Sequence, residues 1–231
     1  MSGEGHITSR IRSLDGNRDD GRKETLVERF EGKRFNAPND LAIDTRGRIY
    51  FTDPRYLGDE PKELDSESVY RLDPDGSVRR IAREVEKPNG IALSADDRPL
   101  YVADTNKRTI GGDAASRIPG AMKVYAFPLD REGLVAGPRR TIYDFGREMG
   151  CDGMTLDARS NLYLTTRSET QPGIVVIDPS GKRLGFLPTR SAAGADAGPM
   201  IPANVEFGRG EDAGTLYVVI DTSLYRVKLK P

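Results

Sequence analysis

The stretch that decides the fold is PNDLAIDTRGRIYFTD, residues 38–53. It begins with a polar corner, Asn39-Asp40, and continues with two short apolar segments on either side of a turn that contains Gly47. Short apolar runs bounded by turn residues are typical of β-strands. The stretch therefore predicts a β-hairpin that is entered through a polar corner.

The same pattern returns three times along the chain. Its copies begin at PNG (88–90), at CDG (151–153) and, more loosely, at ANV (203–205). The polar residues of the four copies, called the corner residues below, are Asn39, Asn89, Asp152 and Asn204, at intervals of 50, 63 and 52 residues. Self-similarity at such a period is typical of solenoids and propellers.

The repeat predicts four strands per full unit, which is the composition of one blade of a β-propeller. In the first unit the expected strands are 41–44, 48–52, 68–72 and 77–82, and in the second they are 91–94, 100–103, 122–128 and 139–143. In the third unit they are 154–156, 161–165, 173–178 and 183–187. The fourth unit has three, at 205–207, 215–219 and 224–229. Segments 6–13 and 23–30 predict the outer half of a further unit. This makes about four and a quarter blades. Either four blades close with strands left over, or the chain is one partial propeller domain, residues 1–231, of a larger ring; we favour the second.

Composition excludes several classes of function. The 35 basic and 36 acidic residues give a formal net charge of -1, which does not support nucleic-acid binding. The sequence contains no apolar run long enough for a membrane span. The N-terminal residues lack the pattern of a signal peptide, which favours a cytoplasmic location but leaves the compartment open.

The sequence has one histidine, His6, and one cysteine, Cys151, which limits the kinds of catalysis it can support. A Ser-His-Asp triad or a multi-histidine metal site would need histidine deep in the fold. We interpret Cys151 as a small buried residue, because no histidine is placed to activate it as a nucleophile. Any catalysis would then depend on carboxylates, amides or a metal with oxygen ligands.

The corner motifs resemble the SMP-30/gluconolactonase/LRE-like family of six-bladed propellers. The resemblance rests on EGKRFNAPND (31–40), YFTDP (50–54), PNGIA (88–92), CDGM (151–154) and IPANVEFG (201–208), found in the family's order. It implies a chain that lacks the first blade and part of the second. It also implies one divalent cation, calcium or zinc in first place and magnesium or manganese as alternatives, bound at the top of the central channel.

The resemblance implies metal ligands at two corner residues, Asn89 and Asp152. Asn39 matches a position that contacts substrate or completes the metal shell. A third family ligand, a glutamate of the first blade, has no counterpart, since Glu4 is not followed by the pattern of an inner strand. Arg34, beside the first corner, is a candidate substrate contact.

The residue types agree with this chemistry. Amide and carboxylate oxygens suit hard divalent cations, and equivalent positions in a radial repeat point to one axis. A cation there could polarise a lactone carbonyl while Asp152 acts as general base on water. We therefore expect a metal-dependent hydrolase that opens a sugar lactone to an aldonic acid, with a small-molecule lactone as its partner. The alternatives are a non-catalytic binding or scaffold propeller with a degraded metal site, and an arylesterase or phosphotriesterase.

Overall fold

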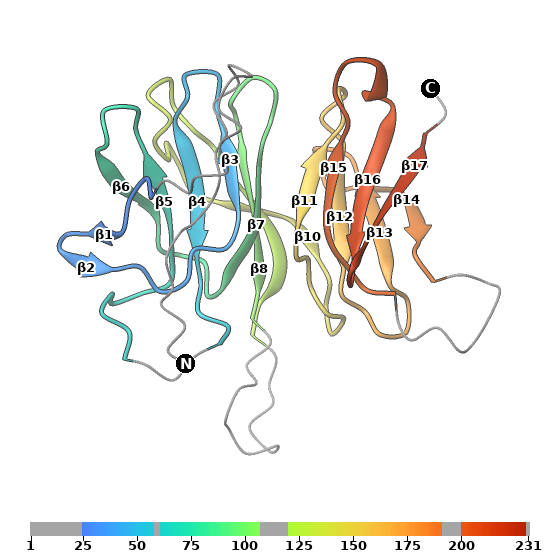
Figure 1. Cartoon of the computed structure of the whole chain (residues 1–231), viewed down its shortest axis with the longest axis horizontal. Coiled ribbons are helices and arrows are strands. Elements are labelled where there is room, and N and C mark those ends of the chain that lie inside the picture. Colours follow the sequence, from blue (N-terminus) through green and yellow to red (C-terminus); the bar gives the residue numbers. More distant parts are fainter. Residues whose placement is uncertain (1–24, 58–60, 107–119, 191–199, 230–231) are drawn as a thin grey trace.

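The computed structural model describes residues 25–57, 61–106, 120–190 and 200–229, which form four consecutive blades of a β-propeller (Figure 1). The first blade contains β3 (Leu41–Ile43), β4 (Ile49–Asp53), β5 (Ser68–Leu72) and β6 (Val78–Ala82). The second contains β7 (Pro88–Leu93), β8 (Leu100–Thr105), β9 (Met122–Phe127) and β10 (Arg140–Asp144). The third contains β11 (Met154–Leu156), β12 (Leu162–Thr166), β13 (Gly173–Ile177) and β14 (Arg183–Pro188). The fourth contains β15 (Pro202–Phe207), β16 (Thr215–Ile220) and β17 (Ser223–Lys228), with a 3₁₀ turn, η2 (Gly210–Asp212), between β15 and β16.

The strands within each blade pair antiparallel in chain order, as the repeat predicted. Two strands begin earlier than expected, β7 at Pro88 and β15 at Pro202. In both, the register with the next strand shifts at the corner. Such a bulge inserts an extra residue and re-aims a side chain. The corners of blades two and four therefore belong to the sheet rather than to a loop before it.

The expected strand at 23–30 is confirmed only at its end: residues 25–28 form no strand, and residues 23–24 lie outside the described residues. The structure has a short hairpin of β1 (Arg29–Phe30) and β2 (Lys33–Arg34) instead. Its turn residues, Glu31 and Gly32, both have positive φ, which is the conformation of a tight two-residue hairpin turn. Phe30 packs on Tyr70 of the first blade with ring centroids 5.1 Å apart. The expected strand at 6–13, together with Glu4, lies outside the described residues.

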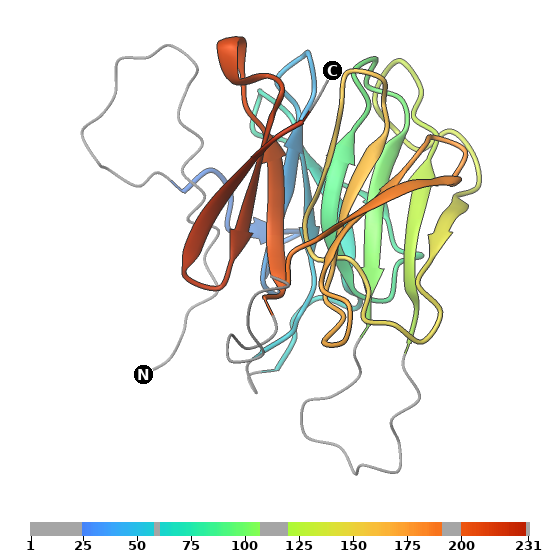
Figure 2. The same cartoon turned by 90° about the vertical axis from the view of Figure 1, so that its right-hand side faces the viewer.

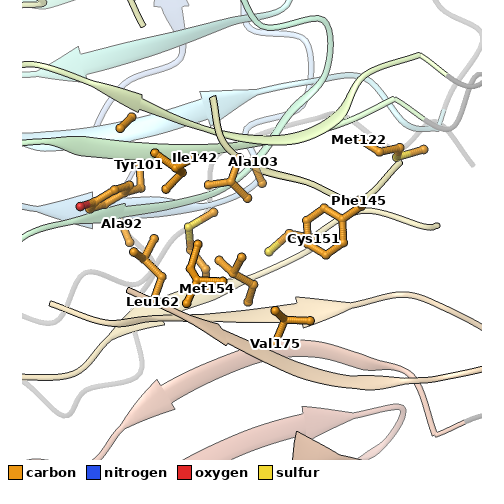
Figure 3. Packing of buried hydrophobic residues seen from close by; sticks show 14 residues of the cluster. Ala92, Tyr101, Ala103, Met122, Ile142, Phe145, Cys151, Met154, Leu162 and Val175 are labelled. Atoms are coloured by element: carbon orange, nitrogen blue, oxygen red, sulfur yellow. The ribbon is translucent and has the colours of Figure 1, made fainter. Parts of the chain in front are cut away.

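Apolar faces of neighbouring blades bury one another. Figure 3 shows the contact between the second and third blades, where Tyr101 and Ala103 of β8 face Met154 and Leu162 of the next blade. Every residue of β8, β12 and β13 is buried, because both faces of these strands are covered. Cys151 belongs to the same cluster and is fully buried, which confirms its interpretation as a core residue.

The first strands of the four blades, β3, β7, β11 and β15, lie side by side in chain order. The view in Figure 2, turned by 90°, shows most strands upright and side by side, with the outer strands β14 and β17 tilted across them. Two glycines let neighbouring first strands approach closely. A Cβ atom on Gly90 would collide with the backbone carbonyl of Asp152, and one on Gly153 would collide with the side chain of Asn204. The corners are thus in backbone contact from blade to blade.

A buried carboxylate, repeated in two blades, closes the loop that leads into each corner. Asp53 accepts hydrogen bonds from the backbone N–H groups of Asn36 (2.9 Å) and Ala37 (2.8 Å). Asp104 accepts equivalent bonds from the N–H groups of Glu86 and Lys87. Burial raises the pKa of Asp53 to about 7 and that of Asp104 to about 6. These two carboxylates brace the backbone and do not line the channel.

We expect Gly90→Ala to destabilise the protein by about 1–3 kcal/mol, because the new methyl group would push the second and third blades apart. Urea unfolding would measure this. Gly185→Ala is the matched control, since a Cβ there meets nothing within 4 Å and the residue also lies in a strand. Equal free energies of unfolding for the two variants would contradict the close approach of the corners.

We expect the free energy of unfolding to depend on pH through Asp53. Its folded pKa of about 7 lies above the unfolded value of 3.8, so the folded state binds more protons between these values. The free energy of unfolding should therefore fall in wild type, relative to Asp53→Asn, as the pH rises from about 4 to about 7. Urea unfolding at a series of pH values would measure the difference.

The control for that series is Asp75→Asn. Asp75 is exposed, and hydrogen bonds from Ser77 hold its pKa below the usual value. The difference between wild type and Asp75→Asn should stay flat over the same pH range. A flat difference for Asp53→Asn as well would show that Asp53 is not a buried, protonatable carboxyl.

Candidate functional site

Hydrogen bonds between blades fix the corners relative to one another. The Thr52 hydroxyl at the end of β4 donates to the carbonyl of Asn89 (2.8 Å), which joins the first blade to the second. The Thr105 hydroxyl donates to the carbonyl of Cys151, which joins the second to the third. The N–H of Gly153 donates to the carbonyl of Ala203 (2.9 Å), which joins the third to the fourth. The corners of four blades therefore form one continuous rim.

Asn89 carries the clearest sign of a site. It lies in the bulge at the start of β7 and is 4% exposed, and its side-chain oxygen Oδ1 has no hydrogen-bond partner among the described residues. The Tyr56 phenol hydrogen-bonds to the Asn89 side chain, but it donates its own proton to the backbone carbonyls of Thr105 (3.2 Å) and Lys87 (3.4 Å), so it does not satisfy Oδ1. Buried polar atoms almost always have a hydrogen-bond partner, so the unpartnered Oδ1 indicates a place where a ligand binds.

Asp152 lies in the corner before β11, next to Asn89 across the contact at Gly90. Its N–H donates to the Thr165 hydroxyl (3.2 Å), and its carboxylate atom Oδ2 pairs with Nη1 of Arg167 at 2.5 Å. The two side chains are 24% and 29% exposed, so the ion pair lies at the mouth of the site and not in its depth. Sequence reasoning missed Arg167, because it follows β12 in a segment without repeat character.

Asp40 is a second carboxylate that sequence reasoning missed. Its side chain accepts the N–H of Leu41 (2.9 Å) and, across the blade boundary, that of Ile91 (3.1 Å). Burial raises its pKa to about 6, and the negative charges of Asp152 and Glu206 raise it further. Carboxylates of blades three and four therefore lie close enough to Asp40 to oppose its ionisation. A signal existed in the sequence: Asp40 stands where the next two repeats have glycine.

Three other residues that the sequence pointed to, Asn39, Asn204 and Arg34, have surroundings unlike those of Asn89 and Asp152. The Asn39 side chain is exposed at the first corner and hydrogen-bonds to no described residue, while its N–H donates to the carbonyl of Thr52. Asn204 uses its Oδ1 to accept the N–H of Val205 (2.7 Å), which is a structural role. Arg34 lies on β2, and its guanidinium pairs with Glu63 at 2.6 Å.

Tyr56 lies beside the corner of the second blade. Its phenol is partly buried, and the pKa of Tyr56 is raised first by this burial and then by the negative charge of Asp152. Lys87 stacks over the same ring at 5.1 Å. Tyr56 lies in a loop outside the repeat pattern, so no sequence signal pointed to it.

The side-chain oxygen atoms at the corners can be assessed as ligands of a cation. Among the described residues no three His, Cys, Asp or Glu side chains are grouped to hold a metal ion. A cation would therefore be bound by the amide oxygen of Asn89, the Asp152 carboxylate and, at the rim, Asn39, with the charges of Asp40 and Glu206 nearby. This is an all-oxygen set, which suits calcium, magnesium or manganese best and also accepts zinc. The buried bare oxygen of Asn89 fits such an ion.

Within the described residues, no helix has the length and apolar character needed to cross a lipid bilayer.

Comparison with known proteins finds lactonases. A gluconolactonase of Zymomonas mobilis is 31% identical over 219 residues, which cover 90% of this chain and 54% of that protein. A lactonase drp35 of Staphylococcus epidermidis is 28% identical over 166 residues, covering 71% of this chain and 44% of that protein. The chain thus spans about half the length of these curated relatives.

Solved structures agree with the fold. A gluconolactonase of Xanthomonas campestris matches with a TM-score of 0.72 and 30% identity, over 92% of this chain and 63% of that one. Regucalcin of Agrobacterium tumefaciens, a calcium-binding protein, matches with a TM-score of 0.58 at 20% identity, which shows the fold alone.

The family model for the SMP-30/gluconolactonase/LRE-like region matches residues 5–222. Its match takes in all four corners and the strands that follow them. The chain belongs to the SMP-30/gluconolactonase/LRE-like family.

Proposed function

We propose that this chain carries the metal-binding side of a hydrolase that opens a sugar lactone to an aldonic acid with the help of one divalent cation. The observation that carries the proposal is the buried Oδ1 of Asn89, which has no hydrogen-bond partner among the described residues and belongs to the corner that packs on the backbone of Asp152. The relatives support the reaction class, since they are a gluconolactonase and a lactonase. They leave the substrate and the metal of this chain open.

Electrostatics favour a cation at this place. Asp40, Asp152 and Glu206 come from three blades, and the two latter charges raise the pKa of Asp40. Like charges held this close repel one another, and a bound cation would relieve the repulsion. Calcium and zinc are the family's metals and our first candidates; the all-oxygen donors favour calcium of the two, with magnesium and manganese as alternatives. When bound, the ion would polarise the lactone carbonyl as a Lewis acid.

The residues of this chain have separate roles in the proposed reaction. Asp152 acts as general base and takes a proton from the water whose oxygen attacks the carbonyl carbon. The ring C–O bond then breaks, and the ring oxygen receives that proton to become the free hydroxyl of the aldonic acid. We assign substrate contact to Asn39, whose exposed side chain has no hydrogen-bond partner among the described residues. A role of Arg34 in substrate binding stays a prediction, because its guanidinium pairs with Glu63.

One observation favours a second candidate. Arg167 already neutralises the carboxylate of Asp152, as it would in a propeller that binds a partner and has lost its metal site. A non-catalytic module of this kind would fold normally and show no metal-dependent hydrolysis. An arylesterase or phosphotriesterase would instead show a metal-dependent rate on a different substrate, so a panel of lactones, aryl esters and phosphotriesters separates these functions.

We expect metal-stripped protein to regain hydrolysis of glucono-δ-lactone when calcium, zinc, magnesium or manganese is added, measured as the release of acid. Asp152→Asn should lower kcat/KM by about 100-fold or more, the usual effect of losing a general base. The control is Asp144→Asn, which likewise removes a carboxylate paired with one basic side chain, Lys123 at 3.4 Å, and should keep the wild-type rate.

Folded protein without a rate on any member of the panel, with any of the four metals, would overturn the enzyme proposal for this chain and favour the binding module. A metal-restored rate that survives in Asp152→Asn would keep the activity but remove Asp152 as the base.

A further inference from the structure

Arg167 contacts the carboxylate of Asp152 through a single hydrogen bond. Nη1 lies 2.5 Å from Oδ2, whereas Nε of the same guanidinium is buried and has no hydrogen-bond partner among the described residues. Arginine and carboxylate pair most strongly through two parallel hydrogen bonds, and this pair lacks the second. The arrangement leaves a buried donor unsatisfied, so it is a weak form of an arginine–carboxylate pair.

We propose that Arg167 is a built-in competitor of the divalent cation, occupying Asp152 when the metal is absent and giving it up when the metal binds. This inference rests on the metal of the proposed function and adds a residue that sets the affinity for it. Arg167 acts through Asp152 and is a positioning residue in this account.

Charge makes the two occupants exclusive. A divalent cation binds a carboxylate oxygen at about 2.3–2.6 Å. With Arg167 still on Oδ2, the two positive centres would lie only about 5 Å apart and would share one negative charge. Asp152 is the sole carboxylate among the proposed ligands, so the ion needs its full charge. The guanidinium must therefore weaken metal binding as long as it stays in place.

The geometry also lets Arg167 leave. Its side chain is 29% exposed, and it follows the end of β12, so the guanidinium can turn toward solvent without disturbing the sheet. The backbone of Asp152 does not depend on this ion pair, because its N–H bonds to the Thr165 hydroxyl and its carbonyl packs on Gly90. Removing Arg167 should free the carboxylate and keep the corner intact.

The test is titration calorimetry of the full chain, stripped of metal, with calcium and separately with manganese. Arg167→Gln should bind about two- to fivefold more tightly than wild type, the scale of one partly exposed ion pair. Arg167→Lys retains the positive charge and should bind less tightly than Arg167→Gln. The matched control is Arg83→Gln, which breaks an arginine–carboxylate pair with Asp65 at 2.6 Å on the surface and should leave the affinity unchanged.

A double-mutant cycle with Asp152→Asn tests whether Arg167 changes the metal affinity through Asp152. In that background Arg167→Gln should no longer tighten binding, because the two residues act through one carboxylate. An affinity of Arg167→Gln equal to or weaker than that of wild type would overturn the inference. So would an equal gain in the Asp152→Asn background.

The outcomes separate this inference from the proposed function. Tighter binding by Arg167→Gln in protein that hydrolyses no lactone would support the competition and count against the enzyme. Metal binding by wild type that Arg167→Gln does not improve would leave the enzyme proposal standing and remove the competitor. The absence of binding in wild type and in every variant would overturn both the metal site and its competitor.

Discussion

The backbone contact between neighbouring first strands is the constraint on which the rest of this structure depends. Gly90 and Gly153 have no Cβ, so the corner of each blade rests directly on the main chain or side chain of the next. Hydrogen bonds from Thr52, Thr105 and Gly153 close the same boundaries. Once this spacing is fixed, the apolar faces of the blades must meet over their whole length, and equivalent positions of each repeat must fall on one rim.

The same constraint produces the chemistry of the rim. Bulges at the starts of β7 and β15 turn their corner side chains away from the ladder. The protein places a buried amide oxygen without a partner at one of these corners and a carboxylate at the next. An unpaired buried acceptor costs stability, and a protein that retains one gains from what binds there. In this structure Arg167 pairs with that carboxylate.

Much of the fold could be predicted from the sequence, and less of the site. The repeat of apolar segments and turns located the blades, because strands in the middle of each full blade, such as β5, β8, β12 and β13, are buried on both faces. It misplaced the starts of β7 and β15, since a bulge keeps the corner inside the sheet and leaves no mark in hydropathy. Asp40 could have been found as a charge that replaces glycine in the repeat. Arg167 and Tyr56 could not, because they reach the site from segments outside the repeat through contacts that only tertiary structure creates.

The central claim is that corners from different blades converge on one cation. Crystals of the metal-stripped protein soaked in manganese, measured for anomalous scattering, test it most directly. The account predicts one strong peak within coordinating distance of Oδ1 of Asn89 and the carboxylate of Asp152, with the guanidinium of Arg167 moved off that carboxylate. A map without a peak at this rim, or with manganese bound only elsewhere, would contradict it.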